Sequence, residues 1–197
     1  LTLMISITQM GYAQQKSVTN SELSISEITK KINDLGQACW NLRLTHSDSA
    51  ANLGHQAISL AEKYDILEPI PRISNYLGVV YMHCLHKEKE SIPYFQQALE
   101  LGIQNKDSTS ISYAYNNLGD AYLLIGNVPL SKHYSLISLD IFERLQSPLG
   151  IAYGYVNMGL VDRIDKAYSS SLVYFKKAIE IRKAAGDKTG IASVTYE

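Results

Sequence analysis

The sequence contains little that would favour β-structure or electrostatic binding to nucleic acids. It has only five prolines among its 197 residues and no stretch of alternating β-branched residues. Both features favour helices over strands. Lys and Arg total 18 against 19 for Asp and Glu, which gives a net charge of −1. We therefore expect no nucleic-acid partner for this region, because such binding usually needs a basic stripe.

The sequence also lacks the short motifs of common catalytic and cofactor sites. It has no phosphate-binding loop, no Gly-x-Gly-x-x-Gly, no His-Glu-x-x-His and no Gly-x-Ser-x-Gly. The one metal-like cluster contains His83, Cys84 and His86. Its two histidines, at i and i+3, would share a helix face with Cys84 turned away, and no second ligand pair lies at a suitable spacing. We therefore predict a non-enzymatic chain without cofactor or metal, and two surface histidines at a helix end.

There are two cysteines, Cys39 and Cys84. We expect both to act as small buried hydrophobic residues. A disulfide between them in an oxidising compartment is the alternative, and sequence alone does not place them within bonding distance.

Leu1–Gln15 has the features of the end of a bacterial secretory signal peptide. A short apolar run is followed by small residues, Gly11 and Ala13, at the −3 and −1 positions of a cut after Ala13. The run is too short to span a membrane, and the charged leading region and initiator Met are missing. We expect a truncated signal peptide over residues 1–15, a polar lead-in over 16–26, and a secreted or periplasmic protein. The alternative is an apolar first helix or tag on a cytoplasmic protein.

The most informative stretch is Tyr115–Tyr122, which has the pattern aromatic-x-x-Leu-Gly-x-x-Tyr. On a helix, Tyr115, Leu118 and Tyr122 fall at i, i+3 and i+7 and share one face. Gly119 lies beside them, although a glycine inside a helix costs about 1 kcal/mol relative to alanine. The pattern therefore predicts a helix that a second helix approaches closely at Gly119.

Copies of this pattern recur along the chain. The motif glycines are 42, 41 and 40 residues apart, and they are Gly36, Gly78, Gly119 and Gly159. A second series of small residues is spaced by 41, 40 and 40, and it consists of Ala57, Ala98, Ser138 and Ala178. Periods of this size are typical of solenoid repeats.

Over residues 22–197 the chain resembles the tetratricopeptide repeat (TPR) family, in a long bacterial form with about 40 residues per repeat. The resemblance implies an all-α fold: a right-handed α-solenoid of antiparallel helix pairs, with eight helices in four pairs and the start of a ninth. The repeats are expected at residues 27–66, 69–104, 108–146 and 149–186, with a fifth beginning over 187–197.

The third repeat departs from the family pattern in its second helix. Ser131, Ser135 and Ser138 occupy the positions that normally hold small or aromatic residues. The substitutions imply either looser packing there or a polar contact surface.

The resemblance also implies a concave face that is lined by the first helices and holds an extended peptide or a partner's helix. Matching the motif positions assigns to this face the residues Asn33, Gln37, Trp40, Asn75, Val79, Met82, Tyr113, Asn116, Asp120, Leu123, Tyr153, Val156, Leu160 and Arg163. The Asn side chains would bond a peptide backbone, and Tyr and Trp would supply apolar contact. A solvated face or an intramolecular contact is the alternative for each. The Lys/Asn carboxylate clamp of co-chaperone repeats is absent, so binding to a Glu-Glu-Val-Asp tail is not predicted.

Two functions are consistent with these features. The first is a non-catalytic scaffold that binds a protein or peptide. The alternative is the extracytoplasmic sensory region of a larger bacterial signalling protein, a sensor histidine kinase or transcriptional regulator, of which this chain would be a fragment. A membrane would then be reached only through a downstream segment.

Overall fold

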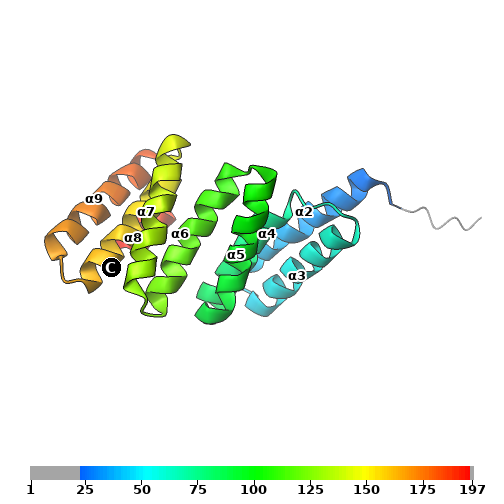
Figure 1. The fold of residues 1–197 in the computed structure, drawn as a ribbon, viewed down its shortest axis with the longest axis horizontal. Coiled ribbons are helices and arrows are strands. Elements are labelled where there is room, and N and C mark those ends of the chain that lie inside the picture. The colour runs from blue at the N-terminus through cyan, green and yellow to red at the C-terminus, as the bar shows by residue number, and fades with distance from the viewer. Residues whose placement is uncertain (1–22, 196–197) are drawn as a thin grey trace, which may run out of the picture.

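The computed structural model describes residues 23–195, and this part of the chain forms a row of helices without strands (Figure 1). The helices are α2 (Ile25–Leu42), α3 (Ser47–Lys63), α4 (Ile70–Val79), α5 (Glu88–Asn105), α6 (Ser108–Leu124), α7 (Val128–Arg144), α8 (Pro148–Ile164), α9 (Tyr168–Ala184) and α10 (Lys188–Thr195). A π-helical segment, η1 (Val80–Cys84), continues α4. The predicted secretory segment and residues 16–22 of the lead-in lie outside the described residues.

Consecutive helices pack as pairs. The helix α2 packs on α3, α4 on α5, α6 on α7 and α8 on α9, and each pair also contacts the next. Figure 1 shows the pairs side by side along the long axis of the molecule, from α2 and α3 at one end to α9 at the other. The predicted all-α solenoid of helix pairs is therefore confirmed.

A 20-residue module builds the repeat from Lys106 onward. Each of α6, α7, α8 and α9 has 17 residues, and three residues separate each from the next helix. The helices end at residues with positive φ spaced 20 apart, namely Lys106, Gly126, Gln146, Lys166 and Gly186. The amide that follows each of them donates to the carbonyl five residues earlier, over 2.8–3.0 Å. This cap satisfies the last free carbonyls of one helix and reverses the chain into the next, so two modules make one repeat.

The π-helical segment accommodates one additional residue in the second repeat. Gly78 and Ala98 are 20 residues apart, whereas Gly119 and Ser138 are 19 apart. In η1 the Leu85 amide donates to the Val80 carbonyl, five residues back, over 3.0 Å. A π-turn widens the helix by one residue without breaking it. The second helix of this pair therefore keeps its register against the motif glycine.

Three of the motif glycines, Gly78, Gly119 and Gly159, lie where the two helices of a pair come closest, whereas Gly36 faces Ile73 of the next repeat. A Cβ atom on Gly159 would lie 2.7 Å from the ring of Phe175, and the ring of Phe95 fills the equivalent space beside Gly78. In the third repeat, a Cβ on Gly119 would lie 3.3 Å from backbone atoms of Ser131 and Ser135. The close approach predicted at Gly119 is therefore present. The small side chains of α7 bring its backbone near that of α6.

The three serines of α7 face the interior. Ser131, Ser135 and Ser138 are all fully buried. They allow close contact between α6 and α7, so neither looser packing nor a polar contact surface describes them. The Ser138 hydroxyl donates to the Ser135 carbonyl over 3.0 Å, whereas the hydroxyls of Ser131 and Ser135 have no hydrogen-bond partner within residues 23–195.

The structure also locates both cysteines. Cys39 is buried, Cys84 is half-buried, and both are free thiols. Burial raises the pKa of Cys39 to about 11, so this side chain is an uncharged part of the core. None of the described helices combines the length and the hydropathy needed to cross a lipid bilayer.

Candidate partner-binding surface

The first helix of each repeat presents one row of side chains that its neighbours leave uncovered. In α6 the row falls at i, i+4, i+7 and i+11, which share a helix face, and it consists of Tyr113, Asn117, Asp120 and Leu124. The matching rows are Lys30, Asp34, Gln37 and Asn41 in α2, Arg72, Tyr76, Val79 and His83 in α4 and η1, and Tyr153, Leu160 and Ile164 in α8. In α8 the remaining position of the row is Asn157, which is buried and does not belong to the uncovered surface. All of the other residues in these rows are half-buried or exposed. Together with Trp40, which precedes Asn41 at the end of α2 and stacks on Tyr76, they form what we call the first-helix stripe.

Contacts between side chains join these rows across the repeats. Tyr76 stacks on Trp40 of α2 with ring centroids 4.8 Å apart. His83 Nε2 lies 2.9 Å from Asp120 Oδ2 of α6. Tyr113 meets Tyr153 of α8 edge-on, with centroids 6.4 Å apart. The rows of four successive first helices therefore form one continuous surface.

Four residues predicted for the concave face lie instead in the seams between first helices. Asn75, Met82, Asn116 and Leu123 are 4%, 1%, 6% and 8% exposed. Each of them immediately precedes a stripe residue in the sequence. Its side chain therefore points toward the next repeat, and the first helix of that repeat covers it. These four side chains therefore have little surface left for a partner.

The buried amides form hydrogen bonds across these seams. The Asn75 side chain donates to the Ser110 carbonyl over 3.0 Å and accepts a bond of 3.3 Å from the Asn117 side chain. The Asn157 side chain donates to Asn116, over 3.1 Å to its backbone carbonyl and 3.2 Å to its side-chain oxygen. The asparagines that were predicted to bond a peptide backbone thus join the repeats, which is the intramolecular alternative.

The other predicted residues keep exposed surface. They are Asn33, Gln37, Trp40, Val79, Tyr113, Asp120, Tyr153, Val156, Leu160 and Arg163. Asn33 accepts a hydrogen bond of 2.6 Å from Arg72, and Gln37 donates one of 3.0 Å to Asn41. Seven of them belong to the first-helix stripe, namely Gln37, Trp40, Val79, Tyr113, Asp120, Tyr153 and Leu160.

Part of the stripe consists of residues outside the predicted concave face. Arg72, Tyr76, His83 and Leu124 face the same surface but were not predicted. Arg72, Tyr76 and His83 fall at i, i+4 and i+11, a spacing that is visible in the sequence. Whether such a residue is exposed or covered depends on which side of its helix the next repeat packs against. The motif positions alone do not give that side.

Charge and burial set the protonation states on the stripe. Partial burial works against protonation of His83, but the hydrogen bond and charge of Asp120, together with the charge of Glu88, outweigh it and raise the pKa. Burial raises the pKa of Tyr113, and the neighbouring phenols of Tyr153 and Tyr76 add to this. The stripe thus holds a Tyr113 that is harder to ionise and a histidine that is easier to protonate than in water.

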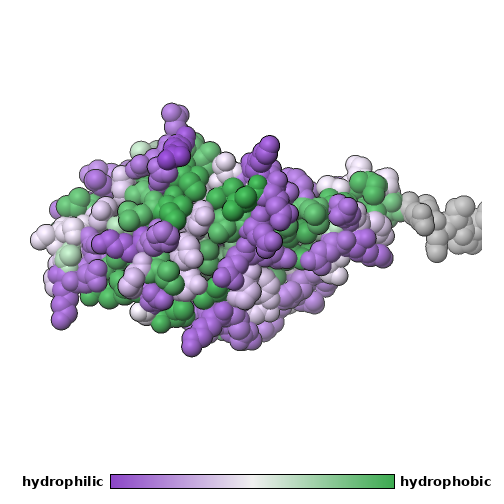
Figure 2. Space-filling view, viewed as in Figure 1, coloured by the Kyte–Doolittle hydropathy of each residue, from purple (hydrophilic) through white to green (hydrophobic). Residues whose placement is uncertain are grey.

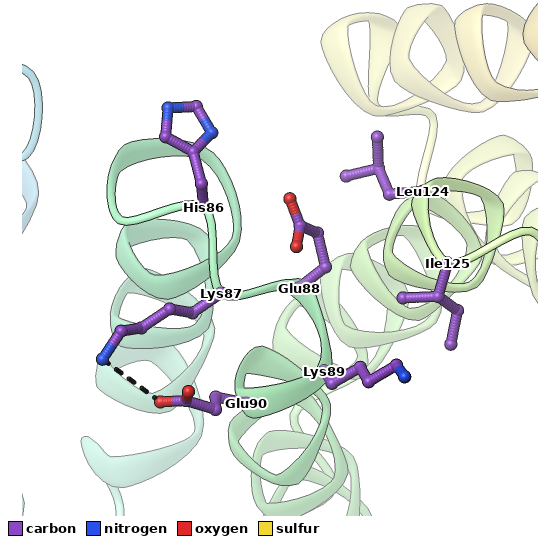
Figure 3. A pocket seen from close by; sticks show the side chains of 7 residues that line it. All are labelled: His86, Lys87, Glu88, Lys89, Glu90, Leu124 and Ile125. Atoms are coloured by element: carbon purple, nitrogen blue, oxygen red, sulfur yellow. Dashed lines mark ion pairs between the residues drawn. The ribbon is translucent and has the colours of Figure 1, made fainter.

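The histidine cluster does not form the shared face expected from sequence. The helical segment ends at Cys84, and His86 lies beyond it with a φ of 54°. His86 lines a shallow depression of about 370 Å³ with Lys87, Glu88, Lys89 and Glu90 and with Leu124 and Ile125 at the end of α6 (Figure 3). Lys87 pairs with Glu90 over 3.4 Å at its edge. Among the described residues, no group of three His, Cys, Asp or Glu side chains is placed to hold a metal ion.

The molecular surface mixes polar and apolar groups. On the face displayed in Figure 2, hydrophilic side chains are interspersed with apolar ones along the row of helices. Exposed apolar residues occur on both helix sets, including Tyr153 and Ile164 on first helices and Leu136 and Leu172 on second helices. Exposure alone therefore does not select a binding face, and the continuity of the first-helix stripe is the distinguishing feature.

The fold is similar to that of Rap proteins. The chain matches the crystal structure of apo RapI with a TM-score of 0.73 and 16% identity, over 98% of this chain and 69% of RapI. It matches a Rap protein in complex with competence and sporulation factor with a TM-score of 0.75 and 16% identity, over 97% of this chain and 52% of that protein. The chain thus spans about half the length of the second protein. Neither models of protein families nor curated proteins gave a match.

Proposed function

We propose that this chain is a non-catalytic scaffold that binds a segment of a protein or peptide along the first-helix stripe. The observation that carries the proposal is the continuity of the stripe across four repeats, through the Trp40–Tyr76, His83–Asp120 and Tyr113–Tyr153 contacts. The half-buried Tyr76 and Tyr113 supply large aromatic area, and tyrosine is enriched in binding hot spots. The Rap protein of similar fold that was crystallised with competence and sporulation factor supports the idea of a bound factor.

The test begins with peptides selected against the chain from a random library. A variant with Tyr153→Ser and Leu160→Ser removes apolar area from the stripe. A matched variant with Leu136→Ser and Leu172→Ser removes exposed apolar area from second helices. We expect the first variant to weaken binding by about tenfold or more and the second to leave it unchanged. Equal weakening by both variants, or weakening by the second alone, would exclude the stripe as the binding surface.

A sensory role within a larger signalling protein is a second proposal. It rests on the signal-peptide pattern of Leu1–Gln15 and would place the scaffold outside the cytoplasm. Extending the gene sequence past the codon for Glu197 tests this role. A membrane-spanning segment followed by a kinase or DNA-binding region would support it, and a stop codon soon after one further helix would contradict it.

A further inference from the structure

Four side chains stack on one another where the stripe crosses from the first repeat to the second. The rings of Trp40 and Tyr76 are stacked at 4.8 Å, with 29° between their planes. The Arg43 guanidinium lies over the Trp40 ring, 3.7 Å from its centroid. The Arg72 guanidinium lies 5.6 Å from the centroid of the Tyr76 ring. We call this group the arginine–aromatic stack, and all four residues are half-buried.

Neither arginine of the stack has an acidic partner among the described residues. Arg43 donates to the backbone carbonyl of Trp40 over 2.7 Å, and Arg72 donates to the side-chain oxygen of Asn33 over 2.6 Å. Cys84, whose thiol feels the charge of Arg43, does not supply an anion, because burial raises its pKa. Two positive charges are therefore held at this site by neutral groups.

Three other cations of the fold show the usual arrangement, in which an acid lies beside the positive charge. Arg144 pairs with Asp140 over 2.8 Å, Arg182 with Asp187 over 2.6 Å, and Lys30 with Asp34 over 2.6 Å. Asp120, an acid on the neighbouring part of the stripe, is already in contact with His83. The arginine–aromatic stack thus places two positive charges close together without the acid that accompanies these other cations.

The geometry of the stack favours carboxylate binding. A guanidinium has five N–H donors, so one hydrogen bond to a neutral oxygen leaves several available. Each guanidinium is already held by a ring and by one bond, which lowers the entropic cost of binding a ligand. Planar guanidinium groups match carboxylates in two-point hydrogen bonds. Partial burial beside the rings strengthens the attraction compared with open water.

We infer that the arginine–aromatic stack binds acidic side chains of an extended polypeptide, and that this contact sets one end of the bound segment. The inference rests on the proposed function, since it names the chemistry of the partner on the same stripe. Further along, Tyr153, Leu160 and Ile164 present apolar and aromatic groups. The segment recognised would therefore carry Glu or Asp residues toward the first two repeats and apolar residues toward the fourth.

Trp40 provides a direct reporter because it is the only tryptophan in the chain. The probes are three end-blocked decapeptides that alternate Ser with Glu, Gln or Lys, each titrated while Trp40 emission is recorded. A fluorescein label on the peptide reports binding independently. We expect the Glu peptide to bind about tenfold or more tightly than the Gln peptide, and to weaken as salt shortens the screening length. We expect no binding of the Lys peptide at this site.

Two double variants of equal charge change localise the effect. Arg43→Gln with Arg72→Gln is expected to remove the preference for the Glu peptide. Lys132→Gln with Lys176→Gln, at exposed sites on α7 and α9, is expected to keep it. Arg43→Lys with Arg72→Lys keeps the charge but loses the planar donors, so we expect a partial loss. Thermal melting shows whether each variant is folded.

The outcomes separate this inference from the proposed function. Equal binding of the Glu and Gln peptides, or a preference that survives loss of both arginines, would overturn the inference. If peptides from the random library still bound the stripe in that case, the proposed function would stand. If neither the decapeptides nor any peptide from the random library bound the chain, both the inference and the proposed function would be overturned.

Discussion

At the scale of single residues, the turns between helices show how one side chain starts the next helix. Asp107, Asn127, Ser147 and Asp187 occur at intervals of the 20-residue module, and each side chain accepts a hydrogen bond of 2.9–3.3 Å from the amide three residues later. Ala167 occupies the same position before α9 and has no side-chain cap. One of the four free amides at the start of α9 therefore lacks the partner that its counterparts have.

The first prediction concerns this missing cap. Ala167→Asn is expected to raise the free energy of unfolding by about 1 kcal/mol, because an asparagine at the N-cap accepts a bond from the first turn. Urea denaturation of the wild type and the variant measures the difference. The matched variant Asn127→Ala removes an existing cap and is expected to lower stability by a similar amount. An Ala167→Asn variant no more stable than the wild type would contradict the assigned capping position.

The second prediction concerns the buried serines of α7. The Ser135 hydroxyl has no hydrogen-bond partner in the part of the chain that the structure describes, whereas the Ser138 hydroxyl donates to the Ser135 carbonyl. A buried unsatisfied hydroxyl costs roughly 1–3 kcal/mol, so Ser135→Ala is expected to stabilise the protein relative to Ser138→Ala. Both substitutions gain the same helix propensity, and their difference isolates the hydroxyl. Thermal unfolding of the two variants measures it, and equal melting temperatures would show that Ser135 has a partner in solution.

At the scale of helices, the His83–Asp120 contact joins the first helices of the second and third repeats. His83 lies in the π-helical segment, and its side chain is 46% exposed. Exposed ion pairs contribute little, typically below about 1 kcal/mol, so this contact adjusts the junction rather than holding it together. Its strength depends on whether the imidazole carries a proton.

The third prediction follows from that dependence on pH. The pKa of His83 is raised in the folded protein, so the stabilisation is complete below its unfolded value near 6.5 and is lost as the pH rises through the folded-state pKa. Asp120→Asn is therefore expected to lower stability by about 0.5 kcal/mol at pH 5.5 and by less at pH 8.5. Urea denaturation at the two pH values measures this. Asp140→Asn, which breaks a pair with Arg144, provides the control, and its effect should not differ between them.

The sequence predicted the helix pairs because glycine and small residues must recur where the helices meet. Gly119 and Gly159 carry that information directly. The Ser24 cap of α2, with Glu27 in the reciprocal position, could also be anticipated from residue type. The positive φ values of Gln146 and Lys166 could not, because neither residue type favours that conformation. In the sequence, the π-helical segment is visible only as a spacing that is one residue longer in the second repeat than in the third.

At the scale of the whole molecule, the binding surface depends on how the repeats are stacked. Asn116 and Asn117 are adjacent in sequence, yet Asn116 is covered by the next repeat and Asn117 lies on the stripe. Motif positions locate the first helix of each repeat but do not show which flank its neighbour covers. This is why part of the predicted face lies in the seams and part on the stripe.

The central claim is that the first-helix stripe holds a polypeptide segment, and NMR mapping tests it most directly. Backbone and side-chain resonances of the isotope-labelled chain are followed while a library-selected peptide is added. The account predicts that the largest shifts occur at Tyr76, Tyr113, Tyr153 and Leu160, in a continuous track across α4, α6 and α8. Shifts confined to the second helices α5, α7 and α9 would contradict it.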